Sequence, residues 1–193
     1  MLTMLPEIES VALDRAIETV GGYSLGDPMI GRNWYAVSVY PRHEKLVARM
    51  CQARDVNYLL PLYSCVRRWK DRRKQIEMVL FPGYVFVNIA LSQRLRVLVL
   101  PGVAHFVSFQ GQPAVVPERE MRALGRGTAS GLSMQPHPYL QKGQLVRVRS
   151  GPMAGVEGIL VRRKDRFRVV LSIDLIMRSA AAEVDESDIE PLA

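Results

Sequence analysis

Six Lys and Arg residues lie within eight positions near the middle of the chain, in the segment RRWKDRRK. They are Arg67, Arg68, Lys70, Arg72, Arg73 and Lys74, with Trp69 among them. Clustered cations bind phosphate groups, and an indole ring can stack on a base. The segment therefore predicts a hairpin tip that contacts nucleic acid in a salt-dependent way, without reading base identity. The alternative is a solvated hairpin whose positive charges discourage pairing with other strand edges.

Aromatic residues crowd the next strand, FPGYVFVNI, which contains a Pro-Gly pair. Because successive side chains of a strand point to opposite faces, Tyr84 and Phe86 share one face and Val85, Val87 and Ile89 share the other. A sheet with one face in water alternates apolar with polar side chains, and this strand does not. Its second face must be covered, either by helices of the same chain or by another molecule.

Residues that support enzyme chemistry are sparse. The only histidines are His43, His105 and His137, and none has the spacing to a second ligand or base that metal sites require. Cys51 and Cys65 are too few for a disulfide scaffold, and we interpret them as small apolar side chains. We therefore expect no catalytic residue, no metal site and no cofactor. An enzyme with an unrecognised site stays open as a rival.

Positive charge is concentrated in the middle of the chain. Residues 34–129 hold fifteen Lys and Arg against six Asp and Glu, whereas the whole chain has a formal net charge of +7. A field of this sign attracts polyanions, of which nucleic acid is the commonest. No apolar run approaches the roughly 20 residues that span a bilayer, and the first residues do not fit a secretory signal. We expect a cytoplasmic monomer with no membrane partner.

The elements that must position these side chains follow from apolar periodicity and turn residues. Residues 1–32 are predicted to form a leader, flexible or in a short helix. Residues 33–127 show the order β-α-β-β-β-α-β-α, which favours an α+β sandwich with helices on one mainly antiparallel sheet. Residues 128–141 form a linker rich in Gly, Ser and Pro. Residues 142–193 contain short strands between turns, typical of a small barrel.

Four segments resemble, in order, the signature of the NusG family of transcription elongation factors. They read NWYAVSVYPRHEKLVARM, LFPGYVFV, LPGVAHFVSF and KGQLVRVRSGPMAGVEGILV. The wording is most similar to the specialised antitermination paralogues of the UpxY type. The resemblance implies an NGN domain, an α/β sandwich with an antiparallel sheet, followed by an all-β, SH3-like KOW barrel.

The resemblance also implies a partner for the aromatic strand. In NusG-like proteins this surface docks on the clamp helices of bacterial RNA polymerase, a coiled coil in the largest subunit. Carried over by motif, the docking residues are Phe81, Tyr84 and Phe86, with Trp34 and Tyr35 beside them on the first strand. Rigid rings are good anchors because they bury a large area at little rotamer cost. The alternative is that these rings are ordinary core under a helix.

The implied activity is antitermination or processive elongation in long operons, often for polysaccharide, with DNA near the transcription bubble as a second partner. By the same resemblance, Arg42 and His43 at the first helix contact DNA or the second large subunit, and ordinary surface charge is the alternative. Leu175, Ile176 and Met177 correspond to the apolar KOW patch that recruits Rho or a ribosomal protein, and RNA is a third candidate. The alternative function is a ribosome-associated, KOW-type RNA-binding protein.

Overall fold

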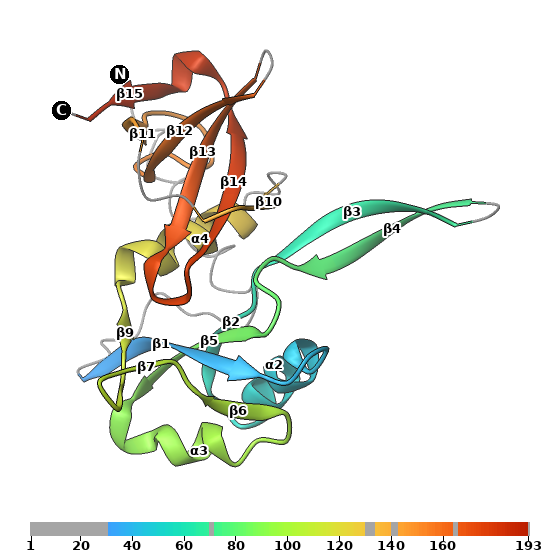
Figure 1. Ribbon diagram of the computed structural model, residues 1–193, viewed down its shortest axis with the longest axis vertical. Coiled ribbons are helices and arrows are strands. Elements are labelled where there is room, and N and C mark those ends of the chain that lie inside the picture. Colours follow the sequence, from blue (N-terminus) through green and yellow to red (C-terminus); the bar gives the residue numbers. More distant parts are fainter. Residues whose placement is uncertain (1–30, 70–71, 130–133, 140–142, 164–165, 193) are drawn as a thin grey trace, which may run out of the picture.

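A computed structural model describes residues 31–69, 72–129, 134–139, 143–163 and 166–192. The leader predicted for residues 1–32 therefore lies almost wholly outside the described residues. Two regions follow each other along the chain, an N-terminal sheet with its helices and a C-terminal barrel (Figure 1). This arrangement confirms the predicted fold class.

The N-terminal region is built on a five-stranded antiparallel sheet. Its strands are β1 (Arg32–Val39), β2 (Asn57–Leu59), β5 (Tyr84–Ala90), β6 (Val103–Phe106) and β9 (Val115–Val116). β1 and β5 lie at its centre, β2 pairs with the outer side of β5, and β6 and β9 pair with β1. A small ribbon of β7 (Ser108–Phe109) and β8 (Gln112–Pro113) lies between β6 and β9 in the chain. The strands fall on the aromatic and β-branched runs of the sequence.

Helices cover both faces of this sheet. They are α2 (Glu44–Ala53), α3 (Arg94–Leu98), which follows the 3-10 turn η1 (Leu91–Gln93), and α4 (Glu118–Ala129). On one face, Val37 and Val87 pack in a cluster with residues of α2 and α3. On the other face, Trp34 and Phe86 pack in a cluster with Leu124 of α4. The alternation of side chains along β1 and β5 divides the apolar residues between two cores.

A two-stranded arm projects from this body (Figure 1). It consists of β3 (Leu62–Trp69) and β4 (Arg72–Val79), paired in antiparallel register and joined to no other strand of the described residues. The apolar run YLLPLYSCVRRW contains Pro61 between β2 and β3. In the structure the run is divided there, because proline has no N–H for a ladder, and β2 and β3 belong to different sheets.

The C-terminal region is a six-stranded antiparallel sheet. Its order is β10-β14-β13-β12-β11-β15, with β10 (Gln135–His137), β11 (Leu145–Val148), β12 (Glu157–Arg163), β13 (Arg166–Ile173), β14 (Arg178–Val184) and β15 (Ile189–Pro191). Two 3-10 turns, η2 (Asp174–Ile176) and η3 (Glu186–Asp188), precede β14 and β15. The layers are tightly packed at Gly158, where an added Cβ would lie 2.7 Å from the carbonyl oxygen of Val170.

One hydrophobic cluster joins the two regions. It includes Trp34 and Phe86 of the sheet, Leu124 of α4, and Val169 and Leu171 of the barrel. In Figure 1, α4 lies between the sheet below and the barrel above. Part of the segment predicted as a linker, β10, pairs with β14 as an edge strand of the barrel. The two regions are therefore joined by a shared core as well as by the chain.

Candidate functional site

The aromatic side chains of the FPGY strand do gather on one face of the sheet, but they are not exposed. Trp34, Phe81 and Phe86 each expose 1% or less of their surface, and the rings of Phe81 and Phe86 meet edge to face at 5.9 Å. Their cover is the cluster that runs through α4 into the barrel. In this structure the three rings are therefore core, which is the alternative that the sequence left open. An apolar face this large is covered by the chain's own elements when they can reach it.

The two tyrosines of the predicted surface have different surroundings. Tyr35 lies on the opposite face of the sheet from Trp34, buried in the core under α2 and α3, where its ring meets Phe106 edge to face at 5.9 Å. Neighbouring residues of a strand cannot share a face, so Tyr35 and Trp34 cannot form one docking surface. Tyr84 is half-buried at the margin of the aromatic cluster. Of the five predicted docking residues, Tyr84 alone is partly accessible.

A buried carboxylate holds the turn that leads into β5. Glu44, the first residue of α2, accepts a hydrogen bond of 2.8 Å from the backbone N–H of Gly83, and its side chain is buried. Gly83 has a φ of +88°, a conformation that favours glycine. We did not single out Glu44 from the sequence. An acidic residue in a first helical turn looks like an ordinary partner of the helix dipole, so no signal marked its distant contact.

His43, directly before α2, packs against neighbouring residues, whereas Arg42 does not. Arg42 is exposed and has a φ of +66°. His43 is half-buried, its Nδ1 lies 3.1 Å from the Pro41 carbonyl oxygen, and its ring meets Tyr40 edge to face. Gly102 gives the His43 ring room, since a Cβ there would lie 2.9 Å from it. Of the predicted pair, Arg42 is available to a partner, whereas His43 is engaged within the protein.

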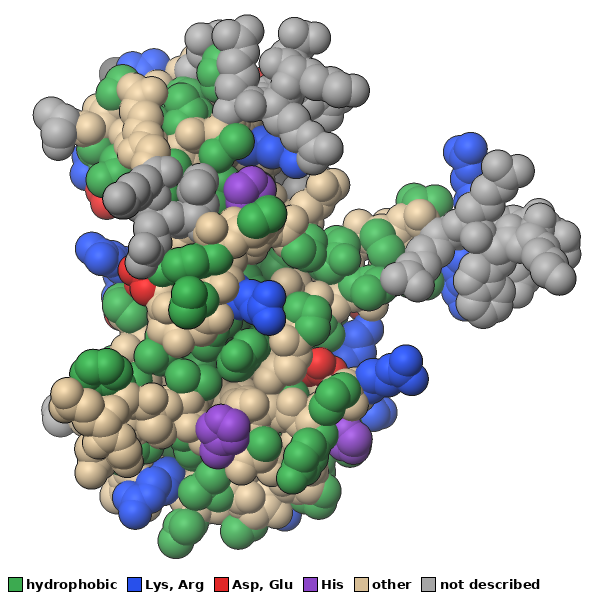
Figure 2. Space-filling model, viewed as in Figure 1, with side chains coloured by type: hydrophobic (Ala, Val, Ile, Leu, Met, Phe, Trp, Pro, Cys, Tyr) green, Lys and Arg blue, Asp and Glu red, His purple; other side chains and the backbone are tan. Residues whose placement is uncertain are grey.

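The arm carries the predicted basic cluster to its far end. In the strand register, Arg67 is opposite Lys74 and Arg68 is opposite Arg73. Arg73 and Lys74 are exposed, and Figure 2 shows Lys and Arg side chains along the outer part of the arm. Lys70 lies outside the described residues, as do the side chains of the other predicted cations. Like charges directly opposite each other repel, so this end of the arm is suited to a polyanion.

The predicted KOW patch is only partly available. Ile176 is buried in the barrel core and Leu175 is partly buried against it, whereas Met177 is 65% exposed. Met177 has a φ of +49°, which turns the chain between η2 and β14. Three consecutive residues of a tight turn cannot all face solvent, which the linear sequence did not reveal.

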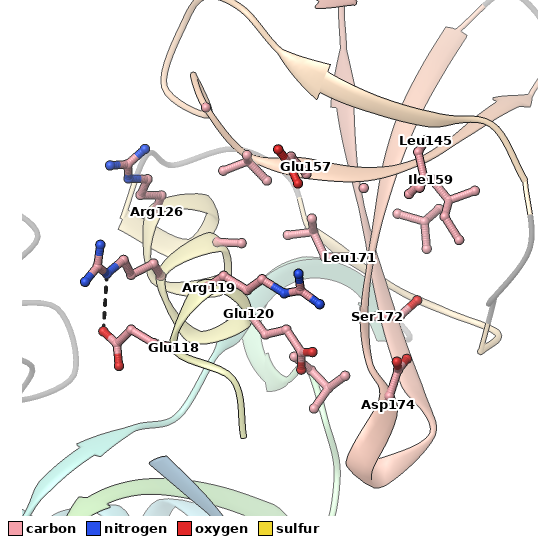
Figure 3. Close-up of a pocket in the computed structure, with 17 residues that line it drawn as sticks. Glu118, Arg119, Glu120, Arg126, Leu145, Glu157, Ile159, Leu171, Ser172 and Asp174 are labelled. Carbon is pink, nitrogen blue, oxygen red and sulfur yellow. Dashed lines mark hydrogen bonds and ion pairs between the residues drawn. The ribbon is translucent and has the colours of Figure 1, made fainter. Parts of the chain in front are cut away.

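A polar contact joins α4 to the barrel. The guanidinium of Arg126 donates a hydrogen bond of 2.8 Å to the carbonyl oxygen of Ala154, in the loop between β11 and β12. Beside this contact is a groove of about 970 Å³, whose walls come from α4 and from barrel residues around β12 and β13 (Figure 3). The groove was not foreseen, because only the tertiary structure brings these elements together.

The described residues hold no group of three or more His, Cys, Asp or Glu that could bind a metal ion. Burial raises the pKa of the Cys51 thiol to about 11, more than the nearby Arg54 lowers it, so this thiol stays neutral and poorly nucleophilic near neutral pH. No helix in the described ranges is long and apolar enough to cross a bilayer.

Comparison with known proteins shows which family this chain resembles. A family model described as "Transcription termination factor nusG" matches residues 32–125. The Pseudomonas aeruginosa "Transcription termination/antitermination protein NusG" is 27% identical over 175 residues, covering 83% of this chain and 99% of the relative. The Escherichia coli protein of the same name is 25% identical over 173 residues, covering 82% of this chain and 96% of the relative. The chain is a NusG-like transcription factor.

A solved structure shares the fold of this NusG-like factor. "Domain interaction in Thermotoga maritima NusG" matches with a TM-score of 0.52 and 23% identity, covering 85% of this chain and 99% of that chain. This match shows the fold, whereas the family model and the two relatives confirm the predicted likeness to NusG. Its predicted assignment to the UpxY-type subgroup stays a prediction.

Proposed function

We propose that this NusG-like factor binds the clamp helices of bacterial RNA polymerase through the aromatic face of its N-terminal sheet, and thereby favours processive, antiterminated transcription. The observation that carries the proposal is the grouping of Trp34, Phe81 and Phe86 on one face, with Tyr84 at its accessible margin. Large rings on a rigid sheet supply anchors at little entropic cost. A partner that binds the moving polymerase better than the paused one shifts the population toward elongation.

Docking through this face requires its cover to move. Phe81 and Phe86 lie under the cluster that continues into α4 and the barrel, so polymerase and this cover compete for the same rings. The Arg126 contact to Ala154 joins the two parts of this cover, α4 and the barrel. Polymerase binding therefore carries the cost of opening, which lowers its apparent affinity by the fraction of molecules that are open.

Two further contacts complete the proposed function. The arm, through Arg73 and Lys74, lies along DNA phosphates near the transcription bubble. The barrel recruits a further partner at its exposed Met177, and Rho, a ribosomal protein and RNA are the candidates. A long operon, such as one for polysaccharide, is the proposed target.

The test is capture of purified bacterial RNA polymerase by the full chain. Tyr84→Ala removes the accessible ring of the face, and we expect capture to fall roughly tenfold or more, as for an interface anchor. Phe109→Ala is the matched control, because Phe109 is 70% exposed on β7 and lies outside the aromatic cluster. Arg126→Ala loosens the cover, and we expect it to raise capture several-fold.

Unchanged capture with Tyr84→Ala, in a variant with an unaltered circular dichroism spectrum, would remove the aromatic face from the proposed function. Loss of capture with Phe109→Ala instead would move the interface to the β7–β8 ribbon. Sedimentation with ribosomes and no capture of polymerase would favour the RNA-binding alternative.

A further inference from the structure

The groove between α4 and the barrel has carboxylates from both sides at one end. Glu120 reaches into it from α4, and Asp174 reaches it from η2 of the barrel (Figure 3). Neither residue belongs to a predicted site, and nothing in the proposed function uses them. Two negative charges that face the same groove from different regions of the chain oppose its closure.

Glu120 is poorly compensated where it lies. Its side chain is half-buried, its Oε2 atom is shielded from solvent, and no described residue offers that atom a hydrogen bond. An ionised carboxylate in such a place loses hydration without gaining a partner, whereas the protonated acid is far less penalised. The protonated form of Glu120 therefore fits the closed groove better than the ionised form.

The neighbouring groups determine whether the charged or the neutral form of Glu120 is favoured. Asp174 repels a charged Glu120, and the hydroxyl of Tyr139 donates a hydrogen bond of 3.1 Å to Oδ1 of Asp174. Arg119, the preceding residue of α4, attracts a charged Glu120 but is itself exposed. Further along the groove the charged lining residues are Glu118, Arg122, Arg126 and Glu157. Repulsion across the groove acts between the two regions, whereas the attraction of Arg119 comes from α4 itself.

We propose that Glu120 is a proton-operated latch: when it is protonated, α4 and the barrel close on each other, and when it ionises, they separate more readily. The latch acts on the same cover that lies over the aromatic face, because α4 and the barrel share one hydrophobic cluster with Phe81 and Phe86. The effect on polymerase docking rests on the proposed function. The opening itself does not.

The sign of the pH dependence follows from the surroundings of the carboxyl group. Burial, and then the charge of Asp174, raise the pKa of Glu120 to about 7 despite Arg119. The closed form thus binds a proton more tightly than an open form in which solvent surrounds the glutamate and restores its ordinary pKa of 4.5. Closure is strongest below that ordinary value, and it weakens as the pH rises toward about 7.

The test measures the distance between the two regions in the full chain without polymerase. Fluorophores are attached at Gln112→Cys, exposed on β8, and Ser187→Cys, exposed on η3, after replacement of Cys51 by Ala and Cys65 by Ser. We expect the population with high energy transfer to fall at least about twofold between pH 5 and pH 8.

The variants assign the effect. Glu120→Gln should stay closed and lose the pH dependence, whereas Glu118→Gln, an exposed glutamate in the same helix turn, should keep it. Asp174→Asn, which retains an oxygen for Tyr139, should move the midpoint to lower pH because a repulsive charge is gone. The latch is refuted if the labelled parent shows no pH dependence, or if Glu120→Gln keeps the pH dependence of the parent. If the distance between the two regions changes with pH but the capture of polymerase does not, the latch stands. Only the proposed competition between polymerase and the cover is then overturned.

Discussion

At the scale of single residues, the contact between Glu44 and Gly83 positions the FPGY turn. It links the first residue of α2 to a turn 39 positions later in the chain. A buried carboxylate that accepts a backbone hydrogen bond is worth more than an exposed one, because its loss leaves a buried N–H without a partner. The orientation of Tyr84, which follows this turn, depends on the contact.

Replacing Glu44 tests this role. Glu44→Ala should lower the free energy of unfolding by about 1–3 kcal/mol, since the Gly83 N–H loses its acceptor in a partly buried place. Chemical denaturation in urea measures the change. Glu118→Ala, which removes an exposed carboxylate paired with Arg122, should change stability by less than about 1 kcal/mol. Equal effects of the two substitutions would contradict the assignment.

Residue types alone could not decide the fate of the aromatic rings. Trp34 and Phe86 have the character of anchors, and the same character makes them good core residues. Their shared face was predictable from strand alternation, and so was the placement of Val85 and Val87 on the other face. Which element covers each face depends on helices that come from distant parts of the chain.

At the scale of elements, the arm stands out because it has no third strand. An isolated two-stranded hairpin is marginally stable in water, and this one also places like charges opposite each other at Arg68 and Arg73. Lys45 of α2 donates a hydrogen bond of 3.1 Å to the Glu77 carbonyl oxygen, which secures the base of β4. Farther along the arm, Arg73 and Lys74 are exposed, so their charges are open to a polyanion.

Charge reversal on the arm should therefore weaken DNA binding and its salt dependence together. Arg73→Glu with Lys74→Glu should reduce the slope of log affinity against log salt by about 2, one for each phosphate that the arm no longer neutralises. Fluorescence anisotropy with duplex and bubble DNA at several salt concentrations measures the slope. The control, Arg49→Glu with Arg94→Glu, makes the same change of charge at exposed positions on α2 and α3. Identical slopes for the two double variants would show that net charge matters and the arm does not.

Element boundaries were predicted well where turn residues are strong. Pro117 lies directly before α4, and the helix runs through Gly125 and Gly127 to Ala129. Helix packing against the sheet and barrel outweighs the low helix propensity of glycine there. The strand β10 was hidden in a segment rich in Gly, Ser and Pro, and it exists because β14 offers it an edge.

At the scale of the whole molecule, the shared cluster makes the two regions depend on each other. Leu124 lies on α4 within one cluster that extends from Trp34 of the sheet to Leu171 of the barrel. Removing a buried leucine leaves a cavity, and here that cavity would weaken the packing of both the sheet and the barrel. The two regions should therefore unfold as one unit rather than as two independent domains.

Leu124→Ala tests this coupling. We expect one calorimetric transition for the parent chain. In the variant, the free energy of unfolding should fall by about 2–5 kcal/mol, and sheet and barrel should melt together at a lower temperature. Hydrogen exchange of amides in β5 and β13 checks that both respond. Leu95→Ala is the control, because Leu95 is 65% exposed on α3 and should change stability by less than about 0.5 kcal/mol. Two separate transitions, with the barrel unaffected by Leu124→Ala, would contradict a shared core.

The sequence by itself determined the two regions, most of their strands and helices, the basic segment and the family. These features depend on local periodicity, turn residues and short motifs, all of which involve residues close together in the sequence. Only the tertiary structure decided that Phe81 and Phe86 are covered, that Ile176 is buried, and that Glu120 faces Asp174. Burial and electrostatic pairing depend on which distant elements meet in space, and a linear pattern does not record such contacts.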